Sequence, residues 1–205
     1  MKYLTFSATE QAAYDVCFLV PTLHKADMIR HYIAPHFKGD EDKVLAYDLF
    51  KEGKKTLVAR QREYLDDLLP VLMDLQVKYL VVADAEYFKT LTKCASAEKE
   101  LGYVHDCVVG GFKVVFCPNY KSVFYNPERT TADIRIALTA VQNHRSGSYT
   151  DPGLGIIKFA AYPDSAVDIK AWLDKLLEMD RDLTCDIEGF SLKHYDAGIG
   201  TISFA

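Results

Sequence analysis

The stretch Val77-Lys78-Tyr79-Leu80-Val81-Val82-Ala83 decides the fold of this chain, and it is followed at once by Asp84 and by a helical pattern over residues 85–93. A short, nearly continuous apolar run of this kind is typical of a strand that is buried on both faces of a sheet. Asp84 suits the N-cap of a helix, because its carboxylate can accept hydrogen bonds from the first backbone N–H groups. The stretch therefore predicts a strand followed directly by a helix.

Two further apolar runs extend this pattern along the chain. The first, Val16-Cys17-Phe18-Leu19-Val20, ends at Pro21, and the second, Phe112-Lys113-Val114-Val115-Phe116, ends shortly before Pro118. Apolar residues at helical spacing follow the second run, over residues 133–141. Alternating strands and helices build a mostly parallel sheet that is covered by helices on both faces. We therefore predict a three-layer α/β/α domain with a mostly parallel central sheet.

A change in composition indicates where this domain ends. Residues 143–153 are rich in Gly, Ser, Asn and Pro and lack periodicity, which is typical of a loop or linker. We place the boundary there, with residues 1–148 in the first domain and residues 149–205 at the start of a second. For the second segment the sequence predicts a strand at 154–160, a helix that opens at Ser165, and strand-like runs at 183–192 and 198–205 joined by a hairpin loop. A hairpin that stops at Ala205 has an unpaired edge, so we expect the second domain to be incomplete.

Composition narrows the class of protein. The chain of 205 residues is 49% hydrophobic and 26% charged, as is typical of a folded protein with an apolar core. Its net charge of −5 gives no general attraction to nucleic acid, so any such contact must come from a local patch or through metal ions. The first residues lack the extended apolar stretch of a secretory leader, and no apolar run approaches the ~18 residues needed to cross a bilayer. We predict a cytoplasmic protein without a membrane partner, located in the host-cell cytoplasm if it comes from a phage.

The cysteines and histidines offer no metal-binding spacing. The 5 cysteines are scattered and never spaced Cys-x-x-Cys. This pattern predicts neither a disulfide framework nor a zinc or iron–sulfur site. His24, His31 and His36 are seven and five residues apart and have no supporting cysteine, so we expect them to have solvent or packing roles.

Two acidic residues, Asp186 and Glu188, are separated by Ile187 in the run 183–192. Residues two apart on a strand point to the same side, so the pattern predicts two carboxylates on one face and a buried isoleucine on the other. A divalent cation relieves the repulsion between such carboxylates, and Mg²⁺ or Mn²⁺ suits these oxygen ligands. In two-metal hydrolysis of a phosphodiester, the ions activate the attacking water and stabilise the leaving oxygen. The alternative is that the pair lies on an ordinary solvent-facing strand.

A longer string around this pair resembles a known motif. Leu183-Thr184-Cys185-Asp186-Ile187-Glu188-Gly189-Phe190-Ser191-Leu192 and Gly198-Ile199-Gly200-Thr201-Ile202-Ser203-Phe204-Ala205 resemble the first exonuclease motif of A-family (polymerase I type) DNA polymerases, particularly those of bacteriophages. The resemblance implies an RNase H-like 3′→5′ exonuclease segment in which Asp186 and Glu188 are catalytic residues that bind Mg²⁺ or Mn²⁺. The later motifs of the family, with further acidic ligands and a water-positioning tyrosine, would follow residue 205. We therefore expect this segment to be inactive by itself.

The first domain resembles another family. Residues 79–91 and the string Cys117-Pro118-Asn119-Tyr120-Lys121-Ser122-Val123-Phe124-Tyr125-Asn126-Pro127 are similar to the strand–turn–helix and the His-Pro-Ser segment of the uracil-DNA glycosylase superfamily. The resemblance spans residues 12–145, and glycosylase-like domains of this kind also precede the exonuclease in some phage polymerases. The chain departs from the family at its catalytic positions. Pro21-Thr22-Leu23-His24 stands where the family has a water-positioning acidic or amide residue, and Cys117 replaces the histidine. A thiol does not replace an imidazole as hydrogen-bond donor to a flipped base, so we expect no base excision.

Basic and aromatic residues gather around residues 113–129. Lys113, Lys121 and Arg129 lie close in sequence to Tyr120 and to two further aromatic residues. This mixture suits contact with phosphates together with stacking on bases. We predict that Lys113, Tyr120, Lys121 and Arg129 bind nucleic acid. The alternative is that the aromatic residues belong to the core and the cations to an ordinary surface.

Together these patterns predict the N-terminal fragment or subunit of a DNA-directed DNA polymerase with a 3′→5′ proofreading exonuclease, acting in phage DNA replication. Its partners would be DNA, the remainder of the polymerase and other replication proteins, and Mg²⁺ or Mn²⁺ would bind only in the completed exonuclease site. The alternative is a noncatalytic glycosylase-fold module that recruits replication partners, in which Asp186 and Glu188 are inert.

Overall fold

The structure is a computed structural model in which most of the chain is described. The residues outside the described part are 8, 10, 54–55, 155–162, 164, 180–181, 183, 190–198 and 205, together with the side chains of 186–189, 199–201 and 203–204. The chain divides into two compact units, Met1–Ile156 and Ile157–Ala205. Each unit is described by itself below.

The first unit is built on a six-stranded sheet with the order β1-β3-β2-β4-β6-β5. The four central strands β3, β2, β4 and β6 are parallel, and the short edge strands β1 and β5 are antiparallel to their neighbours. The bounds are β1 Tyr3–Thr5, β2 Val16–Val20, β3 Val44–Asp48, β4 Tyr79–Val82, β5 His105–Asp106 and β6 Lys113–Phe116. The predicted mostly parallel α/β sheet is confirmed, and β3 is a central strand that the sequence analysis did not predict.

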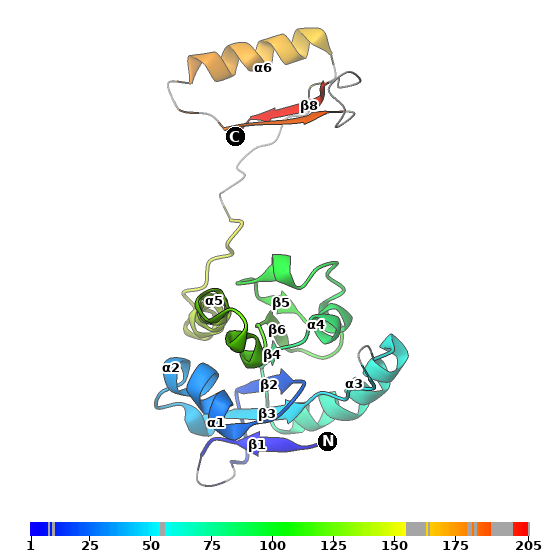
Figure 1. Ribbon diagram of the computed structural model, residues 1–205, viewed down its shortest axis with the longest axis vertical. Helices are drawn as coiled ribbons and strands as arrows, with labels where there is room; N and C mark the ends of the chain where they lie inside the picture. The colour runs from blue at the N-terminus through cyan, green and yellow to red at the C-terminus, as the bar shows by residue number, and fades with distance from the viewer. Residues whose placement is uncertain are drawn as a thin grey trace. The chain divides into compact units, whose positions relative to one another are not determined.

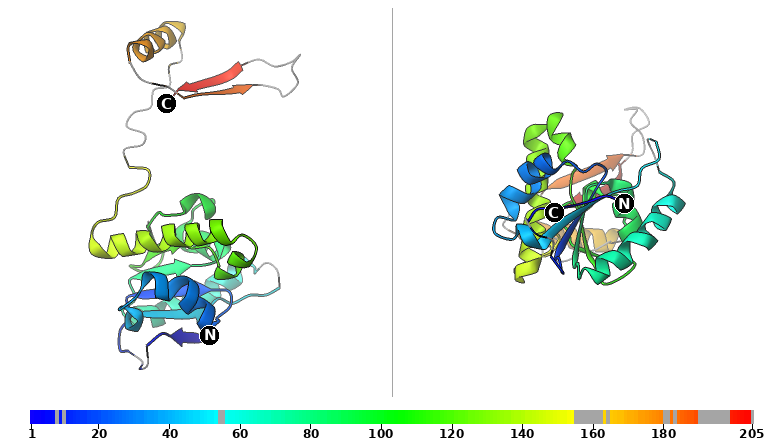
Figure 2. Two further views of the ribbon diagram at one scale, coloured as in Figure 1. Left: turned by 60° about the vertical axis from the view of Figure 1, so that its left-hand side comes forward. Right: turned by 90° about the horizontal axis from the view of Figure 1, so that it is seen from below.

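Helices cover both faces of this sheet (Figure 1). Helices α3 and α4 pack on one face. The helical segment from α1 to α2 packs with α5 on the other face, and the left view of Figure 2 shows α5 in front of the sheet. Their bounds are α1 Lys25–Met28, the π-helical η1 Ile29–Ile33, α2 Ala34–His36, α3 Val58–Asp74, α4 Ala85–Thr92 and α5 Pro127–Ser146. Short 3₁₀ helices are η2 Glu41–Lys43, η3 Glu98–Glu100 and η4 Tyr120–Phe124.

The residues of β2 explain why the sheet needs two covering layers. Cys17 and Leu19 pack into the core under α3 and α4, whereas Val16, Phe18 and Val20 pack into the core on the opposite face. All of these side chains are 0% exposed. Because alternate strand residues point to opposite faces, an uninterrupted apolar run is stable only where both faces are covered.

Two helices show local features that interrupt or end a helix. Helix α3 continues through Pro70 as a single element, although a proline removes one backbone donor inside a helix. Helix α5 runs to Ser146 and ends at Gly147, whose φ of 76° is the left-handed conformation that glycine favours at a helix C-terminus. The loop expected from residue 143 therefore begins only after Ser146.

The second unit contains α6 Ala166–Glu178 and a two-stranded antiparallel sheet of β7 Cys185–Gly189 and β8 Ile199–Phe204. The predicted start of the helix is confirmed, because the Ser165 hydroxyl accepts a hydrogen bond of 3.1 Å from the backbone N–H of Asp168. The strand expected at 154–160 and the hairpin loop at 193–197 fall outside the described residues, except for Leu154, which lies in a turn. None of the helices in the described part of the chain combines the length and the apolarity that crossing a membrane requires.

We expect the fold to lose stability at alkaline pH. Burial raises the pKa of the Cys17 and Cys117 thiols well above their usual value of 9.0, and burial also raises the pKa of Tyr87 to about 12. When the pKa of a group is higher in the folded than in the unfolded protein, its protonated form stabilises the fold. This contribution is fully present at pH values below the unfolded pKa, and it is lost as pH rises toward the folded pKa. The urea midpoint should therefore be constant up to about pH 8 and fall as pH rises through about 9, where the thiols ionise in the unfolded chain.

Urea titrations monitored by circular dichroism at about pH 7, 9 and 10.5 measure this effect. A Cys117→Ala variant is the matched comparison, because it removes one of the buried thiols and should make the alkaline decline shallower. A midpoint that stays constant up to about pH 10.5 would contradict the expectation.

Candidate functional site

The parallel strands bring four loops to one edge of the sheet, which we call the carboxyl edge. It is formed by the residues that follow β2, β3, β4 and β6, namely 21–24, 49–53, 83–84 and 117–119. Strand β2 lies between β3 and β4. The chain passes from β2 to its neighbour β3 and then crosses back over β2 to β4, so the direction in which strands are added reverses at β2. In open parallel sheets, ligands bind at such a reversal of strand order. The carboxyl edge is therefore the first place to look for a site.

Two tyrosines fix the loops after β2 and β6 to each other. The Tyr120 hydroxyl donates a hydrogen bond of 2.8 Å to the backbone carbonyl of Thr22. The Tyr32 hydroxyl donates to the carbonyl of Pro118 at 2.7 Å and accepts from the backbone N–H of Tyr120 at 2.7 Å. Both rings are buried, at 3% exposure for Tyr120 and 0% for Tyr32. Backbone groups of both loops are thus held by side chains of the core.

The loop after β3 is fastened in the same way. The Tyr87 hydroxyl donates to the carbonyl of Phe50 at 2.7 Å, and the Tyr64 hydroxyl donates to the carbonyl of Asp48. Burial is the main cause that raises the pKa values of both phenols, so they remain hydrogen-bond donors at neutral pH. The carboxyl edge is consequently a rigid platform.

The N-terminus of α4 is closed by side chains of the protein itself. Asp84 accepts hydrogen bonds of 3.1 Å from the backbone N–H groups of Glu86 and Tyr87. Its other oxygen lies 2.5 Å from Lys51 Nζ, and the two side chains are only 14% and 28% exposed. A helix N-terminus attracts anions through its free N–H groups, and here a carboxylate already binds them. This end of α4 therefore serves structure rather than anion binding.

The most exposed aromatic residues of the first unit lie where η4 meets α5. Phe124 and Tyr125 are 86% and 85% exposed, and their ring centroids are 5.3 Å apart in an edge-to-face arrangement. Lys121 is exposed on η4, and the Arg129 side chain is 80% exposed in the first turn of α5, 3.8 Å from Asp133. We call Lys121, Phe124, Tyr125 and Arg129 the η4–α5 corner.

Capping interactions hold the backbone of the η4–α5 corner. The Asn119 side chain accepts from the N–H of Lys121 at 2.9 Å, and the Asn126 side chain accepts from the N–H of Arg129 at 3.3 Å. The hydroxyl of Thr130 donates to the carbonyl of Ser122 at 3.4 Å, which joins the helix to η4. The exposed rings are therefore presented from a defined backbone.

The four residues predicted to bind nucleic acid fall into three different environments. Lys121 and Arg129 lie together at the η4–α5 corner. The Tyr120 ring is buried and its hydroxyl is bound to Thr22, so it positions the loops and offers no face for stacking. Lys113 begins β6 at the end opposite to the carboxyl edge, and its ammonium lies 2.6 Å from Asp106, where its hydrogen bond lowers the pKa of that carboxyl.

Cys117, the residue that the sequence resemblance aligns with the glycosylase histidine, is enclosed by the core. Cys117 is 0% exposed, and burial raises the pKa of its thiol. His24 lies in the loop after β2, with 62% of its side chain exposed, and its Nδ1 is 2.8 Å from the carboxylate of Asp27. Among the described residues, neither side chain is in a position to hold a flipped base and activate water in the way the family requires.

The acidic pair occupies β7. Asp186 lies opposite Ser203 and Glu188 opposite Thr201 in the antiparallel register, and the register shifts between Glu188 and Gly189. The two side chains lie outside the described part of the structure. Their role as ligands of Mg²⁺ or Mn²⁺ stays a prediction.

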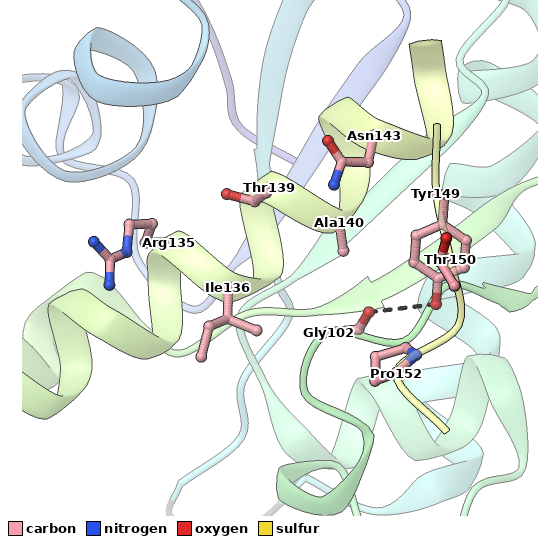
Figure 3. A pocket seen from close by; sticks show the side chains of 9 residues that line it. All are labelled: Gly102, Arg135, Ile136, Thr139, Ala140, Asn143, Tyr149, Thr150 and Pro152. Carbon is pink, nitrogen blue, oxygen red and sulfur yellow. Dashed lines mark hydrogen bonds between the residues drawn. The ribbon is translucent and has the colours of Figure 1, made fainter. Parts of the chain in front are cut away.

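A groove of about 360 Å³ runs between α5 and the segment that follows it (Figure 3). The Tyr149 hydroxyl donates to the carbonyl of Gly102 at 3.3 Å and accepts from the N–H of Val104 at 3.1 Å, which fastens this segment to the first unit. Arg135 is the one charged side chain among the lining residues, and none of them is a carboxylate, thiol or imidazole. Apart from Arg135, the polar side-chain groups of the lining are neutral hydroxyls and one amide.

The exposure of Phe124 and Tyr125 is the part of the site that the sequence did not predict. The segment was recognised as a mixture of basic and aromatic residues, but no periodic pattern distinguishes Tyr120, which is buried, from its exposed neighbours. The asparagines Asn119 and Asn126, which cap η4 and α5, are the local signal that could have indicated a turn of the backbone here.

Comparison of the chain with protein-family models and with curated proteins finds no match. The class of protein is therefore defined by the fold, which is an α/β domain with a six-stranded, mostly parallel sheet flanked by helices.

Proposed function

We propose that this chain is the N-terminal part of an A-family DNA polymerase of a phage, in which the first unit binds DNA without catalysis and the second contributes the first strand of the proofreading exonuclease. The observation that carries the DNA-binding role is the η4–α5 corner, where two exposed aromatic residues stand between two exposed cations in the sequence. The order of the parallel strands is compatible with the glycosylase-like fold that the sequence resembles, and this finer assignment is part of the proposal.

The chemistry of the η4–α5 corner suits single-stranded DNA. Bases stack on aromatic rings with little regard to sequence, and each stacked base contributes ~1–3 kcal/mol. Lys121 and Arg129 can neutralise phosphates on either side of the rings. With a net charge of −5, the chain attracts DNA only where cations are concentrated locally. The corner combines both requirements.

The same geometry argues against base excision. The thiol of Cys117 is buried where an active glycosylase would present an imidazole to the base. The loop after β2 is held at Thr22 by Tyr120 and contains no carboxylate. Formation of abasic product on uracil-containing DNA would contradict the noncatalytic assignment.

The exonuclease part of the proposal rests on the acidic pair in β7. The two residues are two positions apart in one strand of an antiparallel pair, and alternate strand positions share a face. This donor set of two carboxylates fits Mg²⁺ or Mn²⁺, which supplies an activated water for phosphodiester hydrolysis. Asp186 and Glu188 would hold the ion and orient it toward the DNA 3′ end. Variants of these residues in the longer polymerase test this part through proofreading activity.

Removing the two exposed rings should abolish most of the DNA affinity of the chain. We expect Phe124→Ala/Tyr125→Ala to weaken binding of a fluorescent single-stranded oligonucleotide by about 30-fold or more, because it removes ~1 kcal/mol or more for each of two stacked bases. Fluorescence anisotropy with the full 205-residue chain measures the effect.

Two controls separate this effect from general damage. Leu177→Ala changes a side chain on α6 that is 84% exposed, and it should leave both affinity and stability unchanged. Lys121→Gln should weaken binding and reduce the salt dependence of log K by about one unit of slope. Equal affinity of the wild type and the double variant would remove the η4–α5 corner from the proposal.

A further inference from the structure

A cysteine, a glutamate and a histidine converge in the excursion between α4 and β6. Cys94 follows Lys93, which ends α4 in the left-handed conformation with φ 62°. Glu100 belongs to η3, and His105 is the first residue of the edge strand β5, where it lies opposite Val114 of β6. The three side chains come from different local elements, so their convergence is a product of the fold rather than of a helical or strand repeat.

The distances within this cluster are those of potential ligands. Cys94 Sγ lies 3.9 Å from His105 Nδ1, and His105 Nε2 lies 3.0 Å from Glu100 Oε2. One donor atom from each of the three residues can be chosen so that all lie within 4.8 Å of one another. The side chains of His105 and Glu100 are 25% and 27% exposed, so the cluster is mostly shielded from solvent.

His105 has a polar atom that the protein leaves without a hydrogen bond. Its Nε2 is buried and has no hydrogen-bond partner, although Glu100 Oε2 is near, because the direction of the contact does not suit a hydrogen bond. Buried polar atoms in native proteins are nearly always satisfied, and leaving one unpaired costs ~1–3 kcal/mol. A metal ion that binds the imidazole would account for the missing hydrogen bond.

We propose that Cys94, Glu100 and His105 bind a Zn²⁺ ion, with water in the fourth position. Thiolate, imidazole and carboxylate are the donors that zinc uses in proteins, at ~2.3, ~2.0 and ~2.0–2.2 Å respectively. Donor atoms around one tetrahedral zinc are therefore about 3.3–3.6 Å apart, so movements of about 1 Å bring all three into place. The thiolate disfavours Mg²⁺ and Ca²⁺, which take oxygen ligands. The site is thus distinct from the predicted exonuclease metals and does not depend on the proposed function.

A bound metal and an activated thiol differ in the space that they need. A Cys–His–Glu arrangement can also make the thiol a nucleophile, but a nucleophile needs an adjacent cavity for its substrate. None of the three residues lines the groove of Figure 3 or the groove of about 390 Å³ beside Asp15. A metal ion needs no such space, and it would join η3 to β5, whose ladder with β6 contains only two residue pairs.

Metal titration of the full chain tests the site. Metal-free protein should bind one equivalent of Zn²⁺ by calorimetry, and Co²⁺ should produce the visible bands of a tetrahedral centre with a thiolate-to-cobalt charge-transfer band. Cys94→Ser should lose the charge-transfer band, and His105→Gln and Glu100→Gln should lose stoichiometric binding. Zinc should raise the melting temperature of the wild type and leave that of Cys94→Ser unchanged.

Two other residues of the same types provide matched controls. Cys185 is the exposed free thiol of the second unit, and Glu98 is an exposed carboxylate two residues from Glu100. Cys185→Ser and Glu98→Gln should retain binding and the cobalt spectrum. Circular dichroism of each metal-free variant checks that it folds. If one ligand variant does not fold, the zinc binding of the other two ligand variants tests the site.

Three results would overturn the proposal. These are binding well below one equivalent, a cobalt spectrum that survives Cys94→Ser, and alkylation of Cys94 in the folded chain at a rate that zinc does not reduce. The last of these would instead assign the cluster as an activated thiol.

Discussion

Under the proposed function, replacing Asp186 with alanine in the longer polymerase should lower excision of a mispaired primer end by roughly 10³-fold or more while leaving DNA synthesis unchanged. Metal ions stabilise the transition state of phosphodiester hydrolysis by several kcal/mol, and each 1.36 kcal/mol of the activation barrier corresponds to a tenfold change in rate. Glu188→Ala should have a similar effect, because the two carboxylates would share the ion. The expectation rests on the proposed function.

The assay compares excision of a mispaired 3′ end with extension of a matched primer. Asp182→Ala is the matched control, since it removes an exposed carboxylate shortly before β7, and it should retain both activities. Unchanged proofreading in Asp186→Ala would show that the acidic pair is inert. The chain would then be a binding module in which the η4–α5 corner still accounts for DNA contact.

Arg145→Ala should have the largest effect on stability. Its Nε lies 2.6 Å from Asp15 Oδ2, and its Nη1 lies 3.2 Å from Asp40 Oδ2 and 2.8 Å from Gln142 Oε1. The side chains of Arg145 and Asp15 are 14% and 19% exposed, so the truncation leaves a largely buried carboxylate without its main partner. Breaking a buried ion pair costs ~3–5 kcal/mol of stability. We expect a loss of about 2–4 kcal/mol here, because the pair is partly exposed and Lys78 Nζ still lies 3.4 Å from Asp15 Oδ1.

Urea denaturation at neutral pH measures this loss, and Arg129→Ala is the matched control. The side chain of Arg129 is 80% exposed and 3.8 Å from its carboxylate partner, so its removal should change stability by less than about 0.5 kcal/mol. Arg145→Lys should restore only part of the loss, because a single ammonium cannot reproduce the separate contacts of a planar guanidinium. Similar stabilities of Arg145→Ala and Arg129→Ala would contradict the buried role.

The sequence predicted the elements in which local pattern and tertiary environment agree. The apolar runs that become β2, β4 and β6 read as buried strands because every side chain along them is enclosed. Asp84 predicted the start of α4 because a cap depends on residues only two or three positions away. Strand β3 was missed because its short run, Val44-Leu45-Ala46-Tyr47, is equally compatible with a helical segment.

The site depended more strongly on contacts between distant residues. Tyr120 and Tyr125 are indistinguishable by residue type, but packing against Tyr32, with ring centroids 5.8 Å apart, buries the first and leaves the second in solvent. Similarly, Cys94, Glu100 and His105 have no recognisable metal-binding spacing, and the turn after α4 brings them together.

By itself the sequence determined the class of the fold, the main strands and helices, and the acidic pair at Asp186 and Glu188, because periodicity, caps and short spacings are local properties of the chain. Only the tertiary structure decided the order of the strands, which aromatic residues of the η4–α5 corner face solvent, and which side chains share the Cys94 cluster. These features depend on the burial and proximity of residues far apart in the chain, and no local pattern encodes that proximity.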